Sequence, residues 1–352
     1  MPLLHAAAAM AAQESAPRTV FVDTSNEPRT DEEAVAMCTR GLERATAPQD
    51  VADLQFRLAN AQVRRGFGDL AEAAFRACVR ADPRRTDAFN NLGLLLLRRY
   101  DYDAAAREFR RGLAVTPSAE LHLNLGVAVE HGGDLAGAQE CYEHAIQAAP
   151  LDARPHANLG ALASKRGHQR EAVEHHRWAV ALSDDPWLSF NLGDAYEDLG
   201  DVSNAINAYE AALPLPCAKN NLAGLLEQTD PGRVELLYEE ACASSPDDYD
   251  FALNRARWAR AQASEEVLKL FADAAKLCAR PHTCAYQLAE LSAQKGDIGS
   301  ALAHAKRAVS YADSDEIADA RELLRALLEA WRDSLDDANV IEDALAHGME
   351  IS

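Results

Sequence analysis

Apolar residues recur along this chain at the spacing of a helix. Leu92 and Leu96 stand four residues apart, which is about one helical turn. Residues 100–102 interrupt this pattern, and it resumes at Ala105 and Phe109. Intervals of three and four residues place side chains on one face of a helix, so this stretch predicts two helices joined by a short turn.

The same helix-turn-helix pattern recurs with a fixed period. Leu-Gly pairs stand at residues 92–93, 125–126, 159–160 and 192–193, at intervals of 33 or 34 residues. A period in this range indicates one supersecondary unit stacked on copies of itself, each burying the apolar face of its neighbour. The glycine of each pair predicts a close approach of the two helices, and an aromatic residue such as Phe109 fills the space between units.

The units resemble the tetratricopeptide repeat family, whose motif runs Leu-Gly, a turn glycine, and then Ala, an aromatic residue, Ala and Pro. One unit matches the motif at Leu125, Gly126, Gly133, Ala138, Tyr142, Ala145 and Pro150. The resemblance extends over about eight units and about three quarters of the chain. It implies an all-α fold, a right-handed α-solenoid (superhelix) of tetratricopeptide-type repeats.

Some units depart from the motif. His176 stands where an aromatic residue is usual. The unit that contains Leu222-Ala223 and Tyr238 fits only if the turn between its helices is shortened, and residues 251–277 match more weakly. The pattern returns at Leu288-Ala289.

The ends of the chain differ from the repeated middle. Residues 1–30 are rich in Ala, Pro, Ser and Thr and are expected to lack fixed structure. Residues 31–50 predict a leading helix, and residues 51–312 the repeat array. Residues 313–352 predict acidic capping helices, a long amphipathic one and then a short one over residues 336–345, because terminal units must present a polar outer face.

Charge and cysteine content narrow the partners and the compartment. The formal net charge is -21, so nucleic acid and anionic membranes are unfavourable partners. The seven cysteines include no CxxC pair, which favours a reducing cytoplasm over a disulfide framework or a zinc site. The apolar stretch at residues 1–12 has no Lys or Arg before it, so a secretory signal is the less favoured alternative.

The sequence contains no catalytic motif of the common kinds. There is no HExxH, no phosphate-binding GxxxxGK[ST] and no GxSxG. His168, His175 and His176 lack a carboxylate or cysteine at ligand spacing, and packing is the favoured interpretation. We therefore expect no enzyme activity, no cofactor and no metal.

One polar position recurs on the first helix of successive units. The residue before the Leu-Gly or Leu-Ala pair is asparagine in five units, namely Asn91, Asn124, Asn158, Asn191 and Asn221. In tetratricopeptide arrays the first helices line the concave groove, so the resemblance implies an asparagine ladder there, similar to that in the superhelical arm of O-linked N-acetylglucosamine transferase, but without its catalytic domain. A carboxamide both donates and accepts, so it can hold a peptide backbone of any sequence. The alternative is that the asparagines form only local hydrogen bonds or face water.

Charged residues near the ends of the first helices predict further contacts. Arg64, Arg98 and Lys165 could touch an acidic part of a ligand. Residues 52–115 hold 12 Arg and 8 acids, whereas residues 186–250 hold 13 acids and two basic residues. Solvated helix faces without a partner are the alternative for any single charge.

These patterns favour a non-catalytic scaffold that binds an extended peptide or protein segment in the groove. A structural assembly subunit that uses its outer faces or end helices is the alternative, with possible self-association through those helices. A regulatory subunit or arm of a separate enzyme is the remote third possibility. The expected partner is a protein or peptide in all three cases.

Overall fold

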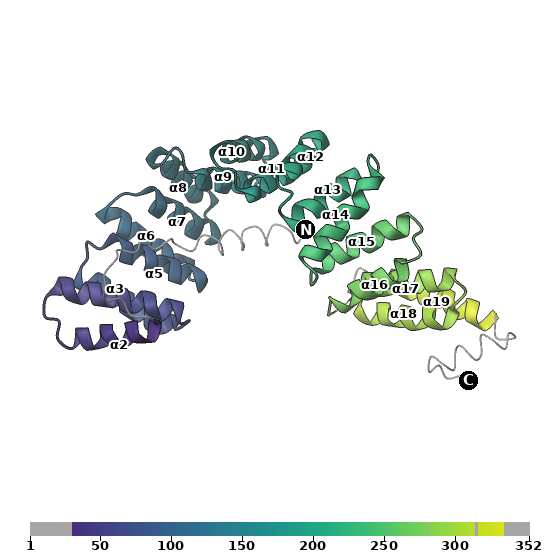
Figure 1. Cartoon of the computed structure of the whole chain (residues 1–352), viewed down its shortest axis with the longest axis horizontal. Helices are drawn as coiled ribbons and strands as arrows, with labels where there is room; N and C mark the ends of the chain where they lie inside the picture. Colours follow the sequence, from purple (N-terminus) through teal and green to yellow (C-terminus); the bar gives the residue numbers. More distant parts are fainter. Residues whose placement is uncertain (1–29, 280, 314–315, 334–352) are drawn as a thin grey trace. The chain divides into compact units, whose positions relative to one another are not determined.

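The computed structural model describes residues 30–279, 281–313 and 316–333 of the chain. Every regular element in these residues is an α-helix, which confirms the all-α prediction (Figure 1). The predictions for residues 1–29 and for a short helix over residues 336–345 lie outside the described residues. No helix among the described residues is both long and apolar enough to cross a membrane.

In the described part of the chain, eight helix pairs follow one another between a leading and a final helix. The first helices of the pairs are α3 (Pro48–Arg64), α5 (Thr86–Arg98), α7 (Ala119–His131), α9 (Ala153–Lys165), α11 (Pro186–Leu199), α13 (Pro216–Leu226), α15 (Tyr249–Ala261) and α17 (His282–Gln294). The second helices are α4 (Gly68–Ala81), α6 (Tyr102–Val115), α8 (Leu135–Ala148), α10 (Gln169–Leu182), α12 (Val202–Ala211), α14 (Pro231–Ser244), α16 (Val267–Lys276) and α18 (Ile298–Tyr311). The leading helix is α2 (Asp31–Leu42) and the final helix is α19 (Ile317–Asp333).

The chain divides into two compact units, Met1–Pro150 and Leu151–Ser352, and each is described by itself. Unit 1 contains α2 to α8, and unit 2 contains α9 to α19. Within each unit every helix packs against the next one along the chain. This is the stacking that a repeat of 33 or 34 residues predicts, because no single helix pair can bury its apolar face alone.

Local chemistry explains where several second helices begin. Gly133 has a positive φ of 93°, a conformation that glycine adopts without steric cost. The next residue, Asp134, accepts a hydrogen bond from the backbone N–H of Gly137 and caps α8. Gly200-Asp201 and Gly296-Asp297 repeat this pair before α12 and α18.

The core of a helix pair is an aromatic ring pressed against a residue without a side chain. Tyr142 and Tyr209 are fully buried. A Cβ atom added to Gly193 would lie 2.5 Å from Cδ1 of Tyr209, and one added to Gly126 would overlap the ring of Tyr142 in the same way. The Leu-Gly glycine is therefore required by the packing of the ring and not by the backbone conformation.

The irregular units keep this architecture by a different adjustment from the one predicted. The turn between α13 and α14 is not shortened, so that prediction is wrong. It spans residues 227–230, while the turn between α5 and α6 spans residues 99–101. This unit has one residue fewer than the others between its Leu-Ala pair and its ring, and the shortening falls in α13, which has 11 residues. Residues 251–277 also form a helix pair, α15 and α16, around the fully buried ring of Phe271.

The final helix covers the last pair of unit 2. Leu327 of α19 is buried, and Leu323 and Leu324 pack against the same cluster as Ala301 and Leu302 of α18. Polar residues occupy much of the opposite face, as expected where a repeat stack ends.

Replacing Gly126 with alanine should destabilise unit 1, because the new methyl group would overlap the ring of Tyr142. We expect a loss of roughly 1–3 kcal/mol in the free energy of unfolding, as for other overpacked cores. Urea unfolding followed by circular dichroism measures it. Gly132→Ala is the matched control, since its methyl group would meet only atoms at 3.4 Å or more and its φ is -71°. Equal midpoints for the two variants would contradict the packing argument.

Candidate peptide-binding face

The predicted asparagines lie where the first helices of neighbouring pairs meet. In unit 1, α5 contacts α7, and in unit 2, α9 contacts α11. All five asparagine side chains are partly buried. We call the surface formed by these first helices in each unit the first-helix face.

In unit 1 the amides are joined from one helix pair to the next. Asn91 donates from Nδ2 to Oδ1 of Asn60 at 3.1 Å, and Asn124 donates to Oδ1 of Asn90 at 2.8 Å. Asn90 in turn donates to Oε1 of Glu120 at 3.4 Å. From Asn124 the donors therefore run through Asn90 to the carboxylate of Glu120, and each bond of such a chain polarises and strengthens the next.

Unit 2 contains a similar chain. Asn254 donates to Oδ1 of Asn220 at 3.1 Å, and Asn220 donates to Oδ1 of Asn221 at 3.2 Å. Asn221 then donates to Oδ1 of Asp194 at 3.2 Å. This chain also ends at a carboxylate.

The five predicted asparagines thus fall into two groups. Asn91, Asn124 and Asn221 take part in hydrogen bonds between helix pairs, which is the local role that the sequence analysis kept as an alternative. Asn158 and Asn191 make no side-chain hydrogen bond to another described residue. Sequence reasoning missed Asn60, Asn90, Asn220 and Asn254, because they stand outside the register of the Leu-Gly pair and meet the ladder only through packing.

The predicted cations differ in their surroundings. Arg64 forms an ion pair with Asp31 of the leading helix at 2.6 Å. Lys165 is exposed at the end of α9 and has an interaction partner. Arg98 is exposed at the end of α5, and the described part of the chain supplies it with no ion pair. Arg98 is therefore the most available of the three to a ligand.

Three tyrosines of second helices anchor a glutamate of the preceding first helix. The phenol of Tyr142 donates to Glu130 at 2.8 Å, that of Tyr209 to Glu197 at 2.8 Å, and that of Tyr238 to Glu227 at 2.9 Å. In α3–α4 and α5–α6, which have a phenylalanine at this position, the corresponding residue is apolar: Val63 precedes Phe75, and Leu97 precedes Phe109. The buried hydroxyl is thus satisfied wherever it occurs, as buried polar groups generally are.

The Tyr209 site holds a second carboxylate. Tyr209 also lies 2.6 Å from Oδ1 of Asp194, so two carboxylates share one phenol. Burial, with the nearby charges of Glu197 and Asp198, raises the pKa of Asp194 to about 6 despite the hydrogen bonds from Tyr209 and Asn221. Burial and Asp194 raise the pKa of Tyr209 far above its usual range, so it stays protonated.

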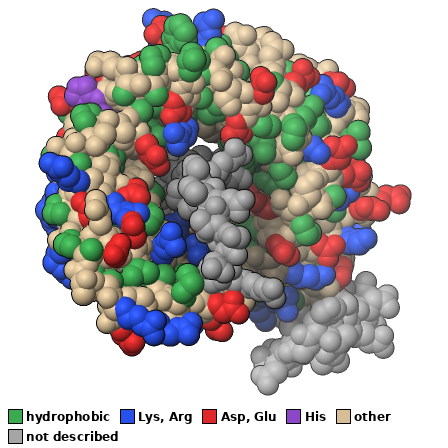
Figure 2. All heavy atoms as spheres, turned by 60° about the vertical axis from the view of Figure 1, so that its left-hand side comes forward, with side chains coloured by type: hydrophobic (Ala, Val, Ile, Leu, Met, Phe, Trp, Pro, Cys, Tyr) green, Lys and Arg blue, Asp and Glu red, His purple; other side chains and the backbone are tan. Residues whose placement is uncertain are grey.

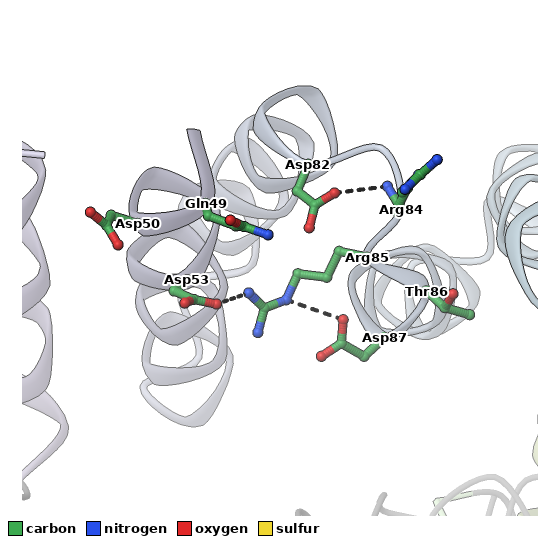
Figure 3. Close-up of a pocket in the computed structure, with 8 residues that line it drawn as sticks. All are labelled: Gln49, Asp50, Asp53, Asp82, Arg84, Arg85, Thr86 and Asp87. Carbon is green, nitrogen blue, oxygen red and sulfur yellow. Dashed lines mark hydrogen bonds and ion pairs between the residues drawn. The ribbon is translucent and has the colours of Figure 1, made fainter. Parts of the chain in front are cut away.

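Unit 1 also contains an open polar hollow of about 680 Å³ that sequence reasoning missed. Arg85 lies between Asp53 and Asp87 and bonds to both, whereas Arg84 points away from them (Figure 3). Arg85 also stacks over the ring of Phe56 at 4.4 Å. The available signal was the spacing of Asp53 and Asp87, which stand 34 residues apart near the starts of the successive first helices α3 and α5.

Charges of both signs are interspersed with hydrophobic side chains on the face shown in Figure 2. Ion pairs also join neighbouring helix pairs, as between Arg99 and Glu72 at 2.6 Å. Among the described residues no three His, Cys, Asp or Glu side chains are grouped so that they could hold a metal ion.

The fold and the repeated contacts between helices define a helical-repeat protein. Comparison with known protein families matches the tetratricopeptide repeat at residues 56–114, 96–153 and 188–215. These residues therefore carry tetratricopeptide repeats, and this repeat indicates a protein-interaction scaffold.

Solved structures with the same kind of fold include PilF from Pseudomonas aeruginosa, which is 17% identical with a TM-score of 0.51 over 62% of this chain and 100% of that one. A MamA structure from Desulfovibrio magneticus RS-1 is 20% identical with a TM-score of 0.43, over 51% of this chain and 98% of that one. The Cut9–Hcn1 hetero-tetramer of the APC/C is 17% identical with a TM-score of 0.45, over 85% of this chain and 53% of that one. At these identities the likeness to PilF concerns the fold alone.

Replacing Asp194 with asparagine should stabilise unit 2 at neutral pH. Because the folded chain raises the pKa of Asp194 from 3.8 to about 6, the folded state binds this proton more tightly than the unfolded state. The stabilisation of the folded state by protonated Asp194 is fully present below about pH 4 and is lost as the pH rises through about 6. The neutral amide avoids that loss, so we expect a gain of roughly 1–3 kcal/mol at about pH 7.5 and little change at about pH 4.

Thermal melts of the full chain at the two pH values measure this effect. Asp184→Asn is the control, since Asp184 is an exposed carboxylate before α11 whose charge does not contribute to the pKa shift of Asp194. A stabilisation by Asp194→Asn that is equal at both pH values would contradict the assignment.

Proposed function

We propose that the first-helix face binds an extended segment of a partner protein through the backbone of that segment. The observation that carries this proposal is the recurrence of half-buried carboxamides on five successive first helices, Asn91, Asn124, Asn158, Asn191 and Asn221. An extended peptide presents N–H and C=O groups in alternation, and a carboxamide pairs with both.

The hydrogen bonds between helix pairs support this role. The Nδ2 atom of Asn124 uses one N–H on Asn90, which leaves its second N–H and the lone pairs of its oxygen for a ligand. The same bond fixes the rotamer of the amide. Less side-chain entropy is then lost on binding than with a freely rotating amide, because the orientation is set in advance.

Asn158 and Asn191 are the amides with the most capacity for a ligand. Both are partly buried, and neither side chain is hydrogen bonded to another described residue. A ligand backbone would replace only water at these positions. Two to three such hydrogen bonds, each contributing roughly 0.5–1.5 kcal/mol, correspond to a moderate gain in affinity that is independent of peptide sequence.

Charge then selects the composition of the bound segment. In unit 1, Arg98 offers an exposed guanidinium at the end of α5, and Arg64 adds positive charge at the end of α3; Lys165, at the end of α9, belongs to unit 2. In unit 2, residues 186–250 hold 13 acids and only two basic residues, which gives this stretch a negative charge. We infer that acidic side chains of a ligand favour unit 1 and basic ones unit 2, since complementary charge sets register and partner choice.

The scaffold acts by holding its partner, without catalysis of its own. The family matches indicate no catalytic domain. The partner is a protein or a peptide.

The double variant Asn158→Ala/Asn191→Ala tests the proposal. Peptides are selected with the full chain from a random library displayed on phage, and their dissociation constants are measured by fluorescence anisotropy. We expect the double variant to weaken binding about tenfold, because two backbone hydrogen bonds are lost and about 1.4 kcal/mol corresponds to a factor of ten.

Asn207→Ala is the matched control, since Asn207 is an exposed asparagine on the second helix α12. It should leave the affinity unchanged. Circular dichroism should show that the double variant stays folded, because neither amide bonds to another described residue. Unchanged affinity in the double variant, or a library that yields no binder, would count against backbone recognition at this face.

A further inference from the structure

One helix pair places a histidine in the position that other pairs give to an aromatic ring. His176 of α10 is 3% exposed. A Cβ atom added to Gly160 of α9 would lie 2.6 Å from its Cε1 and Nε2 atoms, so the imidazole occupies the same close contact as Tyr209 does against Gly193. The Nδ1 atom of His176 is buried and has no hydrogen-bond partner among the described residues.

The partner that satisfies the other polar rings is absent from this pair. Glu130 and Glu197 stand four residues after the Leu-Gly glycine and accept from the tyrosines. In α9 the residue four places after Gly160 is Ser164. A hydroxyl carries no charge, so it cannot compensate a protonated imidazole as a carboxylate would.

The neighbouring histidines add to this cost. Nδ1 of His156 on α9 lies 3.4 Å from Nδ1 of His175 on α10, and their rings are 5.7 Å apart. One ring must donate and the other accept, so at least one of these two imidazoles is neutral. Burial, and to a lesser extent the charge of His175, lowers the pKa of His176 from 6.5 to about 4. Burial and His175 also lower the pKa of His156.

No carboxylate on the packed helices offsets these charges. On α9, Arg154 bonds to Asp152. On α10, Glu171 pairs with His168 at 3.3 Å, and Glu174 and Arg177 are exposed. On α11, Asp194 and Glu197 are turned to Tyr209.

We propose that the helix pair α9–α10 is a proton-sensitive segment of unit 2, in which uptake of a proton by His176 opens the pair and disrupts the first-helix face at Asn158. The argument for this opening depends only on the packing of His176. The effect of the opening on a ligand rests on the function proposed above: mild acid would then release the bound segment.

The direction of the effect follows from linkage. A histidine whose pKa is lowered by folding contributes stability that is fully present above about pH 6.5 and is lost as the pH falls through about 4. The population of the opened form then rises by up to about tenfold per pH unit within this window. Asp194 acts in the opposite direction because its pKa is raised, so a variant at His176 is needed to isolate the histidine.

Hydrogen exchange followed by mass spectrometry on the full chain, without ligand, measures the opening of α9 and α10. Between about pH 7.5 and about pH 5, we expect the opening equilibrium of the wild-type pair, corrected for the intrinsic exchange rate, to rise roughly ten- to thirtyfold. In His176→Phe this rise should be lost, because phenylalanine fills the same position in the α3–α4 and α5–α6 pairs without titrating.

Two further variants keep the test decisive. His168→Gln changes an exposed histidine of the same helix pair and should retain the wild-type response. If His176→Phe fails to fold, His176→Tyr combined with Ser164→Glu recreates the phenol–carboxylate pair of α7–α8 and should also suppress the rise. The same pH response in wild type and in these His176 variants would overturn the proposal.

The affinity of a selected peptide, measured at the same two pH values, separates this inference from the proposed function. Loss of affinity in acid that is suppressed by His176→Phe supports both. A peptide that binds equally at both pH values overturns the coupling to the ligand and leaves the proposed function standing. Absence of peptide binding at neutral pH contradicts the proposed function, while the exchange result still decides the opening.

Discussion

The close contact between a second-helix ring and a first-helix glycine determines the geometry of the four helix pairs from α5–α6 to α11–α12. Gly93, Gly126, Gly160 and Gly193 all lie against such a ring, and a methyl group at any of them would overlap it. Protein interiors are packed too densely to absorb that overlap without strain. The contact fixes how near the two helices approach. It thereby fixes which side chains of the first helix remain available at the surface.

The ring position of the second helix is occupied by three kinds of residue, and each deals differently with polar atoms in the core. Phe109 brings no polar atom, and its neighbour Leu97 is apolar. Tyr142 brings a hydroxyl and is matched by Glu130, at the cost of holding a carboxylate partly out of water. His176 brings a ring that fits this apolar position while it is neutral, and Ser164 cannot compensate the charge of its protonated form. The three solutions differ little in shape and greatly in their response to pH.

The asparagines show that one side chain can serve both the stack and a ligand. Asn91 and Asn124 join neighbouring helix pairs through one N–H each, and a carboxamide has a second N–H and an acceptor to spare. The local role and the binding role that the sequence left as alternatives are therefore compatible. Asn158 and Asn191 lack the bonds between helix pairs, which makes them the positions where the two roles can be told apart.

The sequence by itself determined the helix-turn-helix repeat, because the period of 33 or 34 residues and the Leu-Gly spacing are local properties of the chain. It also placed the five asparagines on first helices. Only the tertiary structure decided that Asn60, Asn90 and Asn220 complete the amide chains, and that Arg85 bonds to both Asp53 and Asp87. Side chains about 30 residues apart become neighbours only when helix pairs stack. Whether a polar group is satisfied or stranded depends on that packing and cannot be read from its spacing along the chain.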